Sequence, residues 1–198
     1  MLLLELIGQF EDMKIISMSL GGGSSVSIES ACDAAYGAGI VVVASAGTSG
    51  NPIGRGDNVG YPAAYSSVIA VAATGINDIR ARWSSTGPDV ELAAPGMSIY
   101  STVPGGYSTK SGTSMACPHV AGTAALVMTA NPGWTNEQVR QQLRDTADDL
   151  GAAGRDNSYG YGLLDADEAA SQPIDVHGGK CFFACRMGIQ PNSKRGGE

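Results

Sequence analysis

A serine that directly precedes an apolar segment has the clearest capacity for chemistry in this sequence. Ser114 lies in S-G-T-S-M-A-C-P-H-V-A-G, residues 111–122, and residues 123–130 continue as an apolar run. This pattern predicts a tight turn followed by a helix that is buried on nearly all sides. The first turn of a helix carries unpaired N–H groups and a positive dipole end, which stabilise an oxyanion. A nucleophile therefore fits, although a hydroxyl and a helix alone favour a simpler role for Thr113 or Ser114 as helix cap.

A nucleophilic serine needs a base within hydrogen-bond reach. The sequence contains two histidines, His119 and His177. His119 follows Ser114 by five residues, about 140° around a helix, so we expect the two side chains to diverge and His119 to be a packed structural residue. His177 lies in a C-terminal segment without apolar periodicity. We therefore predict that neither histidine is the base.

The cysteines offer two further possibilities for chemistry. Cys117 is expected to be a small buried residue, because a thiol nucleophile would also need a base. Cys181 and Cys185 follow His177 with the spacing H-x3-C-x3-C, which could place zinc ligands on one helical face. The two glycines after the histidine and the lack of a nearby fourth ligand favour a flexible tail instead.

Composition limits the class of protein. A chain of 198 residues with 43% hydrophobic and 16% charged residues suits one domain with a real core. Its formal net charge of −7 argues against a nucleic-acid or anionic-membrane partner. No apolar run reaches the roughly 20 residues that cross a bilayer. The N-terminal leucines lack a basic flank and are interrupted by Glu5, so no signal peptide is predicted.

Strand and helix patterns alternate along the chain, which predicts a layered α/β domain with a largely parallel sheet. The β-branched run at 40–44 is typical of a parallel strand covered on both faces. The glycines at 21–23 do not make a dinucleotide loop, because Val26 replaces the third glycine of that motif. We expect helices at 3–10, 24–37, 113–130, from 135 and near 170, strands at 14–20, 40–44 and 68–73, shorter and more exposed strands within 81–94, a hairpin at 100–103 and 107–110, and an irregular loop at 46–62.

The string G-T-S-M-A-C-P-H-V-A-G resembles the active-serine motif of the subtilisin-like serine proteases, the subtilase family, and the resemblance covers roughly residues 15–170. It implies a subtilisin-like three-layer fold and a serine endopeptidase in which Ser114 is the nucleophile and donates its own N–H to the oxyanion. In subtilisins the triad Asp and His precede the serine, yet no histidine precedes Ser114 here. We therefore expect residues 1–172 to be the serine half of a peptidase domain, incomplete at its N-terminal side, and residues 173–198 to be a tail or linker.

The same resemblance assigns residues around the nucleophile. Thr48 stands where the family has an asparagine that donates to the oxyanion; loss of that donor in subtilisin lowers kcat by about 10²–10³. Threonine keeps only a shorter hydroxyl donor, and Asn51 is an alternative donor. The resemblance implies that an extended peptide pairs with one segment and that a small, neutral pocket accepts large apolar side chains. The walls implied for this pocket are Ser19, Leu20 and Gly21 on one side and Ser45, Ala46 and Gly47 on the other.

A weak structural cation site, for calcium or a monovalent ion, is also implied by the resemblance. Its oxygen ligands suit a hard cation, but its acidic residues equally fit solvated turns. No cofactor is expected for the chemistry, and the family implies secretion. The expected partners are an extended polypeptide substrate and a complementing chain that carries Asp and His; the alternative is an inactive fragment or pseudoprotease that retains a peptide-binding cleft. The implied cation ligands are the carbonyls near Ala63, Tyr65 and Val68 and the side chains of Asp89 and Glu91.

Overall fold

The computed structural model describes residues 13–171. The helix expected at 3–10 and the tail at 173–198, with its histidine and two cysteines, lie outside the described residues. In chain order the elements are β1 (Ile15–Met18), α2 (Val26–Gly37), β2 (Val41–Ser45), β3 (Ile69–Thr74), β4 (Val90–Pro95), β5 (Ile99–Val103), β6 (Gly106–Lys110), α3 (Thr113–Ala130), α4 (Asn136–Asp145) and α5 (Ala166–Ser171).

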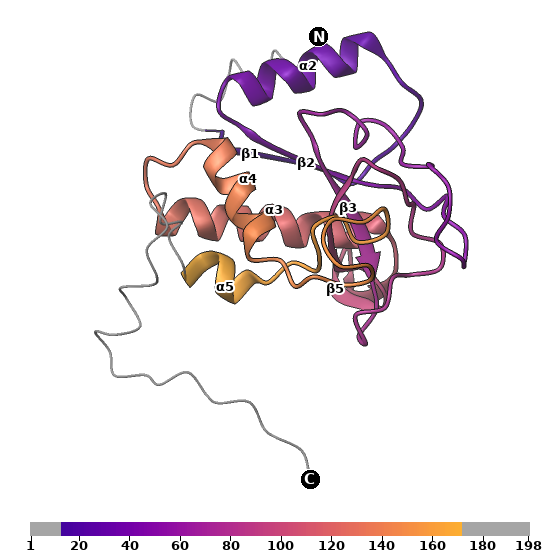
Figure 1. Cartoon of the computed structure of the whole chain (residues 1–198). Helices are drawn as coiled ribbons and strands as arrows, with labels where there is room; N and C mark the ends of the chain where they lie inside the picture. The colour runs from indigo at the N-terminus through magenta and orange to yellow at the C-terminus, as the bar shows by residue number, and fades with distance from the viewer. Residues whose placement is uncertain (1–12, 172–198) are drawn as a thin grey trace, which may run out of the picture.

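Four parallel strands form the central sheet in the order β1-β2-β3-β4. Helix α2 covers one face, and α3, α4 and α5 lie on the other (Figure 1). Alternate residues of β2 serve the two layers: Val42 packs with α2, whereas Val41 and Val43 pack with α3. All five residues of β2 are buried, as expected for a parallel strand between two helical layers. The three-layer α/β fold is thus confirmed.

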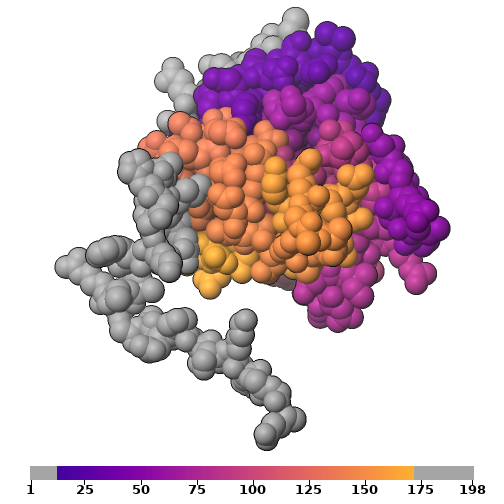
Figure 2. All heavy atoms as spheres, in the orientation of Figure 1, coloured from indigo at the N-terminus to yellow at the C-terminus, as the bar shows by residue number. Residues whose placement is uncertain are grey.

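Most predicted elements agree with the structure to within a few residues. The hairpin is β5–β6, paired in antiparallel register from Ile99 opposite Lys110 to Val103 opposite Gly106. The helix predicted from residue 135 is α4, which begins with a capping box between Thr135 and Gln138. In Figure 2 the C-terminal elements, coloured orange, pack against the magenta middle of the chain. No helix within residues 13–171 is long and apolar enough to cross a membrane.

The prediction of short, exposed strands within 81–94 was wrong. This region contains one strand, β4, whose first five residues are buried. Residues 162–164 cover its outer edge. The Ala93 N–H donates to the Gly162 carbonyl, and the Leu164 N–H donates to the Ala93 carbonyl. Because this cover comes from a segment about 70 positions away, the local pattern of small residues does not reveal it.

The prediction that α3 is buried on nearly all sides was also wrong. One face packs on the sheet through Val120, Ala124 and Val127, all fully buried. The opposite face is open, and Leu126 is 54% exposed. The reason is that the described residues place no further layer over this face, and β1 pairs with β2 alone. The other exposed positions of α3 are Pro118, His119, Gly122, Ala125, Thr129 and Ala130.

Candidate active site

Ser114 lies in the first turn of α3, close to the carboxyl ends of the parallel strands. The helix begins at Thr113 with Gly112 as N-cap, and no side chain caps it. The Gly112 N–H donates to the Gly96 carbonyl at 2.9 Å, which anchors the helix start just beyond β4. The helix-cap interpretation of Thr113 and Ser114 therefore does not hold. Ser114 is half-buried, and its N–H lies in the turn where helical N–H groups lack intrahelical acceptors.

A proline shapes the backbone at Ser114. Pro118 follows four residues later inside α3 and has no N–H, so it cannot donate to the Ser114 carbonyl as a helical residue normally would. The Ser19 hydroxyl donates to that carbonyl instead, at 2.7 Å. In return, the Ser114 hydroxyl donates to the Ser19 carbonyl at 3.4 Å. The segment after β1 is thus joined to the candidate nucleophile by two hydrogen bonds.

The two implied walls of the substrate pocket lie side by side. They follow the neighbouring parallel strands β1 and β2, and the Ser45 hydroxyl donates to the Leu20 carbonyl at 3.4 Å. The second wall also contacts α3, because the Gly47 N–H donates to the Thr113 hydroxyl at 3.2 Å. Gly47 has φ +110°, and a Cβ there would lie 2.9 Å from the Ser85 hydroxyl. Both the conformation of Gly47 and its surroundings therefore disfavour a side chain at this position.

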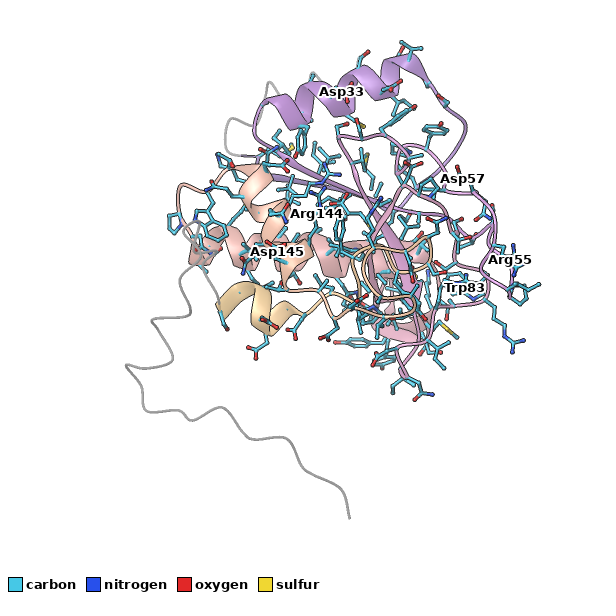
Figure 3. The ribbon with its side chains drawn as sticks, viewed as in Figure 1. Asp33, Arg55, Asp57, Trp83, Arg144 and Asp145 are labelled. Carbon is cyan, nitrogen blue, oxygen red and sulfur yellow. The ribbon has the colours of Figure 1, made fainter. Side chains whose placement is uncertain are left out.

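Thr48 follows this wall and is exposed, on the loop that a hydrogen bond from Gly47 joins to α3. Asn51, the alternative donor, is occupied within its own loop. Its side-chain amide donates to the Arg55 carbonyl at 2.5 Å, and its side-chain oxygen accepts from the Ile53 and Arg55 N–H groups. Asn51 is therefore a loop-shaping residue, which the sequence pattern did not indicate. The same loop carries Asp57, labelled in Figure 3.

A cavity of about 510 Å³ opens beside Ser114, between α3 and the β5–β6 hairpin. His119 lines it but is exposed, contrary to the prediction of a packed residue. Its Nδ1 lies 2.8 Å from the Met115 carbonyl, one turn back on α3. Within residues 13–171, no hydrogen bond joins this imidazole to Ser114. Lys110 lines the same cavity.

Cys117 is fully buried, as predicted. Its thiol lies 3.5 Å from the Ser17 hydroxyl. Burial raises the pKa of the Cys117 thiol, and the contacts with Ser17, Met18 and Ser19 only partly offset this effect. A buried, protonated thiol is a poor nucleophile, so Ser114 remains the candidate nucleophile of this region.

The implied cation ligands differ in burial and in the partners that they already have. Ala63 and Tyr65 are buried, and the Tyr65 carbonyl accepts from the Val68 N–H at 2.9 Å. Asp89 is exposed; partial burial, followed by the charge of Asp57, raises the pKa of its carboxyl.

Glu91 departs from the prediction. The residue is only 4% exposed, and its carboxylate forms ion pairs with two arginines instead of being open to an ion. The partners are Arg140 and Arg144, from α4. No periodicity or motif in the sequence links a residue in β4 to arginines about 50 positions later, so these partners were missed.

Comparisons with known proteins agree with this arrangement. A profile described as the Subtilase family matches residues 6–162. Subtilisin amylosacchariticus of Bacillus subtilis subsp. amylosacchariticus is 49% identical over 163 residues, covering 80% of this chain and 41% of that protein. Subtilisin DY of Bacillus licheniformis is 49% identical over 160 residues, which cover 80% of this chain and 57% of that protein.

A solved structure shares the fold. The crystal structure of the psychrophilic subtilisin-like protease Apa1 from the Antarctic psychrotroph Pseudoalteromonas sp. AS-11 matches with a TM-score of 0.76 and 21% identity, over 84% of this chain and 72% of that chain. The chain spans between two fifths and three fifths of the length of the two subtilisins above. Motif, fold and sequence similarity together show that the chain belongs to the subtilase family.

Proposed function

We propose that this chain carries the nucleophile of a serine-type endopeptidase, with Ser114 as the attacking residue. The observation that carries the proposal is the position of Ser114: half-buried, in the uncapped first turn of α3, beside the ends of β1 and β2. Ser19 bonds to Ser114 itself, and Gly47 bonds to the neighbouring Thr113. Both residues lie on the segments that the family resemblance implies as substrate walls. In any fold, acyl transfer to serine needs a hydroxyl next to N–H donors for the oxyanion. Ser114 offers its hydroxyl and its own N–H at the start of α3.

The chemistry follows from these groups. The Ser114 Oγ attacks the carbonyl carbon of a peptide bond while a base accepts its proton. The carbonyl oxygen becomes an oxyanion that the Ser114 N–H and a hydrogen bond from Thr48 stabilise. Collapse of the tetrahedral intermediate releases the amine, which takes up the proton, and water then hydrolyses the acyl ester. The Thr48 donor is weaker than an asparagine amide, so we expect a lower kcat than in asparagine-bearing relatives.

We assign the base and its orienting carboxylate to residues outside this sequence, in a longer polypeptide or in a complementing chain. His119 is engaged with the Met115 carbonyl, while the cavity beside Ser114 has about 510 Å³ available. A base must approach the hydroxyl to about 2.6–3.2 Å. The cavity and the open face of α3 leave room for such a base to reach Ser114. The residues that line the cavity do not include those of the two substrate walls, so the base and the substrate approach from different sides.

The substrate in this proposal is an extended polypeptide. It lies along Ser19–Gly21 and places an apolar side chain between that wall and Ser45–Gly47. Leu20 is 59% exposed at this edge and supplies apolar contact area. We further propose that the complete protein is secreted, as family membership suggests, and that its chemistry needs no cofactor.

A fluorophosphonate probe, which reacts covalently with activated serines, tests the proposal. We expect labelling of Ser114 when the chain is mixed with the polypeptide that carries the triad Asp and His, taken from the part of subtilisin DY that precedes its match to this chain. Since a positioned base contributes about 10²–10⁴ in rate, labelling should rise by at least about 10²-fold. The Ser114→Ala variant should lose the label, and Ser101→Ala, a matched serine in the same cavity, should keep it.

The alternative function is a pseudoprotease or inactive fragment that keeps a peptide-binding cleft. Two observations favour it: a threonine occupies position 48, and His119 contacts the Met115 carbonyl instead of the Ser114 hydroxyl. It predicts that an extended apolar peptide binds the chain while Ser114 stays unlabelled even in the complemented mixture. That result would replace the catalytic proposal.

A further inference from the structure

Four oxygen atoms meet where α4 contacts the sheet, and they form what we call the oxygen cluster: the two carboxylate oxygens of Glu91 and the carbonyls of Ser66 and Val68. Glu91 lies in β4, and the two carbonyls belong to the segment that leads into β3. Glu91 and Val68 are buried. Carboxylate and carbonyl oxygens are the ligands that hard cations take, so the cluster requires a positive charge at its centre.

The Arg140 guanidinium occupies this centre. Its Nε donates to Glu91 Oε1 at 2.7 Å, and its Nη2 donates to Glu91 Oε2 at 2.5 Å and to the Val68 carbonyl at 3.3 Å. Its Nη1 donates to the Ser66 carbonyl at 3.0 Å. Arg140 is 7% exposed, and the planar fork of donors matches a carboxylate in bidentate geometry. One guanidinium thus satisfies all four oxygens.

The surroundings hold this charge in place. Arg144, labelled in Figure 3, comes from the next turn of α4 and donates through Nε to Glu91 Oε1 at 2.9 Å. The Tyr36 ring of α2 lies 5.4 Å from the Arg140 Cζ, in cation–π geometry. Burial opposes the charged form of Arg140, but the hydrogen bonds and charge of Glu91 outweigh it and raise the pKa of the guanidinium. The cation is therefore permanent.

We propose that Arg140 is the resident cation of the oxygen cluster, and that the cluster for this reason binds no metal ion. A metal would have to coordinate Glu91 and Val68 beside a buried guanidinium that already uses their oxygens, so two cations would compete for one set of ligands. The family's weak cation site and this chain thus disagree at these two residues. The proposal leaves Asp89 free to bind an ion separately, and it does not depend on the reactivity of Ser114.

Calcium dependence of stability tests the proposal. Urea unfolding of the 198-residue chain is measured with saturating calcium and with EDTA, because an ion that binds the native state raises the midpoint. For the unmodified chain we expect no calcium-dependent shift, or a shift that Asp89→Asn abolishes. Asp89 is exposed, so this variant should fold. A shift that survives Asp89→Asn and disappears in Glu91→Gln would overturn the proposal.

Removal of the internal cation provides the converse test. Arg140→Met leaves the carboxylate and the two carbonyls without their main partner, so the variant should be less stable in EDTA and should regain part of the loss in calcium. Terbium(III), a luminescent substitute for calcium, should bind it and be excited through Tyr36, whereas Arg140→Met combined with Glu91→Gln should not bind. A folded Arg140→Met variant that takes up no terbium would refute the inference that the cluster is a cation site. If Arg140→Met does not fold, the comparison of the unmodified chain with Asp89→Asn decides.

Discussion

Replacing Pro118 by alanine should remove the energetic importance of the Ser19 hydroxyl. The Ser19 hydroxyl donates to the Ser114 carbonyl at 2.7 Å because proline at position 118 lacks the N–H that would otherwise bond there. Pro118→Ala introduces that N–H inside α3, four residues after the carbonyl, where helical geometry brings it into line. The carbonyl then has its helical donor, and the hydroxyl becomes redundant.

The magnitude follows from the exposure of the bond. A typical intramolecular hydrogen bond contributes about 0.5–1.5 kcal/mol net, and the exposed position of Ser19 places this one in the lower half, at about 0.5–1 kcal/mol. Ser19→Ala should therefore cost about 0.5–1 kcal/mol when Pro118 is present and close to zero when alanine replaces it. The coupling free energy of the double-mutant cycle should equal that difference, about 0.5–1 kcal/mol.

Urea unfolding of the four proteins measures the coupling. With a slope of about 2 kcal/mol/M, typical of a domain of this size, Ser19→Ala should lower the midpoint by about 0.25–0.5 M in the proline background only. Ser17→Ala is the matched control: it removes an exposed serine hydroxyl from β1 that contacts the Cys117 thiol instead of the Ser114 carbonyl. Its cost should be the same in both backgrounds.

Equal costs of Ser19→Ala in the presence and absence of Pro118 would refute the reasoning. That outcome would mean that the Ser19 hydroxyl does not replace a missing helical donor. The link between the end of β1 and the backbone of Ser114 would then need another origin.

Three further predictions concern the surroundings of the site. Gly47→Ala should cost about 1–3 kcal/mol in unfolding free energy, because φ is +110° and a Cβ would meet the Ser85 hydroxyl at 2.9 Å; an unchanged urea midpoint would contradict this. Partial burial of the Asp89 carboxyl, followed by the charge of Asp57, raises its pKa, so the stability that the protonated form contributes is lost as pH rises through that pKa. Asp89→Asn should therefore gain stability relative to the unmodified chain from acidic to neutral pH, and urea unfolding at each pH measures this gain. Cys117, buried and with a raised pKa, should react with iodoacetamide only as fast as the chain opens, and rapid modification seen by mass spectrometry of the folded chain would be inconsistent with its position.

The amino-acid sequence by itself determined the elements that depend on neighbouring residues. The apolar runs of β2 and β3, the turn residues of the β5–β6 hairpin and the cap of α4 are local signals, and each predicted element is present. The motif around Ser114 likewise identified the candidate nucleophile and the family, because its specified positions lie within twelve residues. Local patterns were sufficient wherever an element is stabilised by its own residues or by a uniform environment on both faces.

Only the tertiary structure decided which groups meet and which faces are covered. The exposure of α3 and of His119 depends on layers that the helix sequence does not encode, and the burial of β4 depends on a segment about 70 residues later. The exchange of hydrogen bonds between Ser19 and Ser114 joins residues 95 positions apart, and the capture of Glu91 by Arg140 joins residues 49 positions apart. The physical reason is that hydrogen bonds and ion pairs act over a few ångströms in space, whereas sequence patterns report only periodicity along the chain.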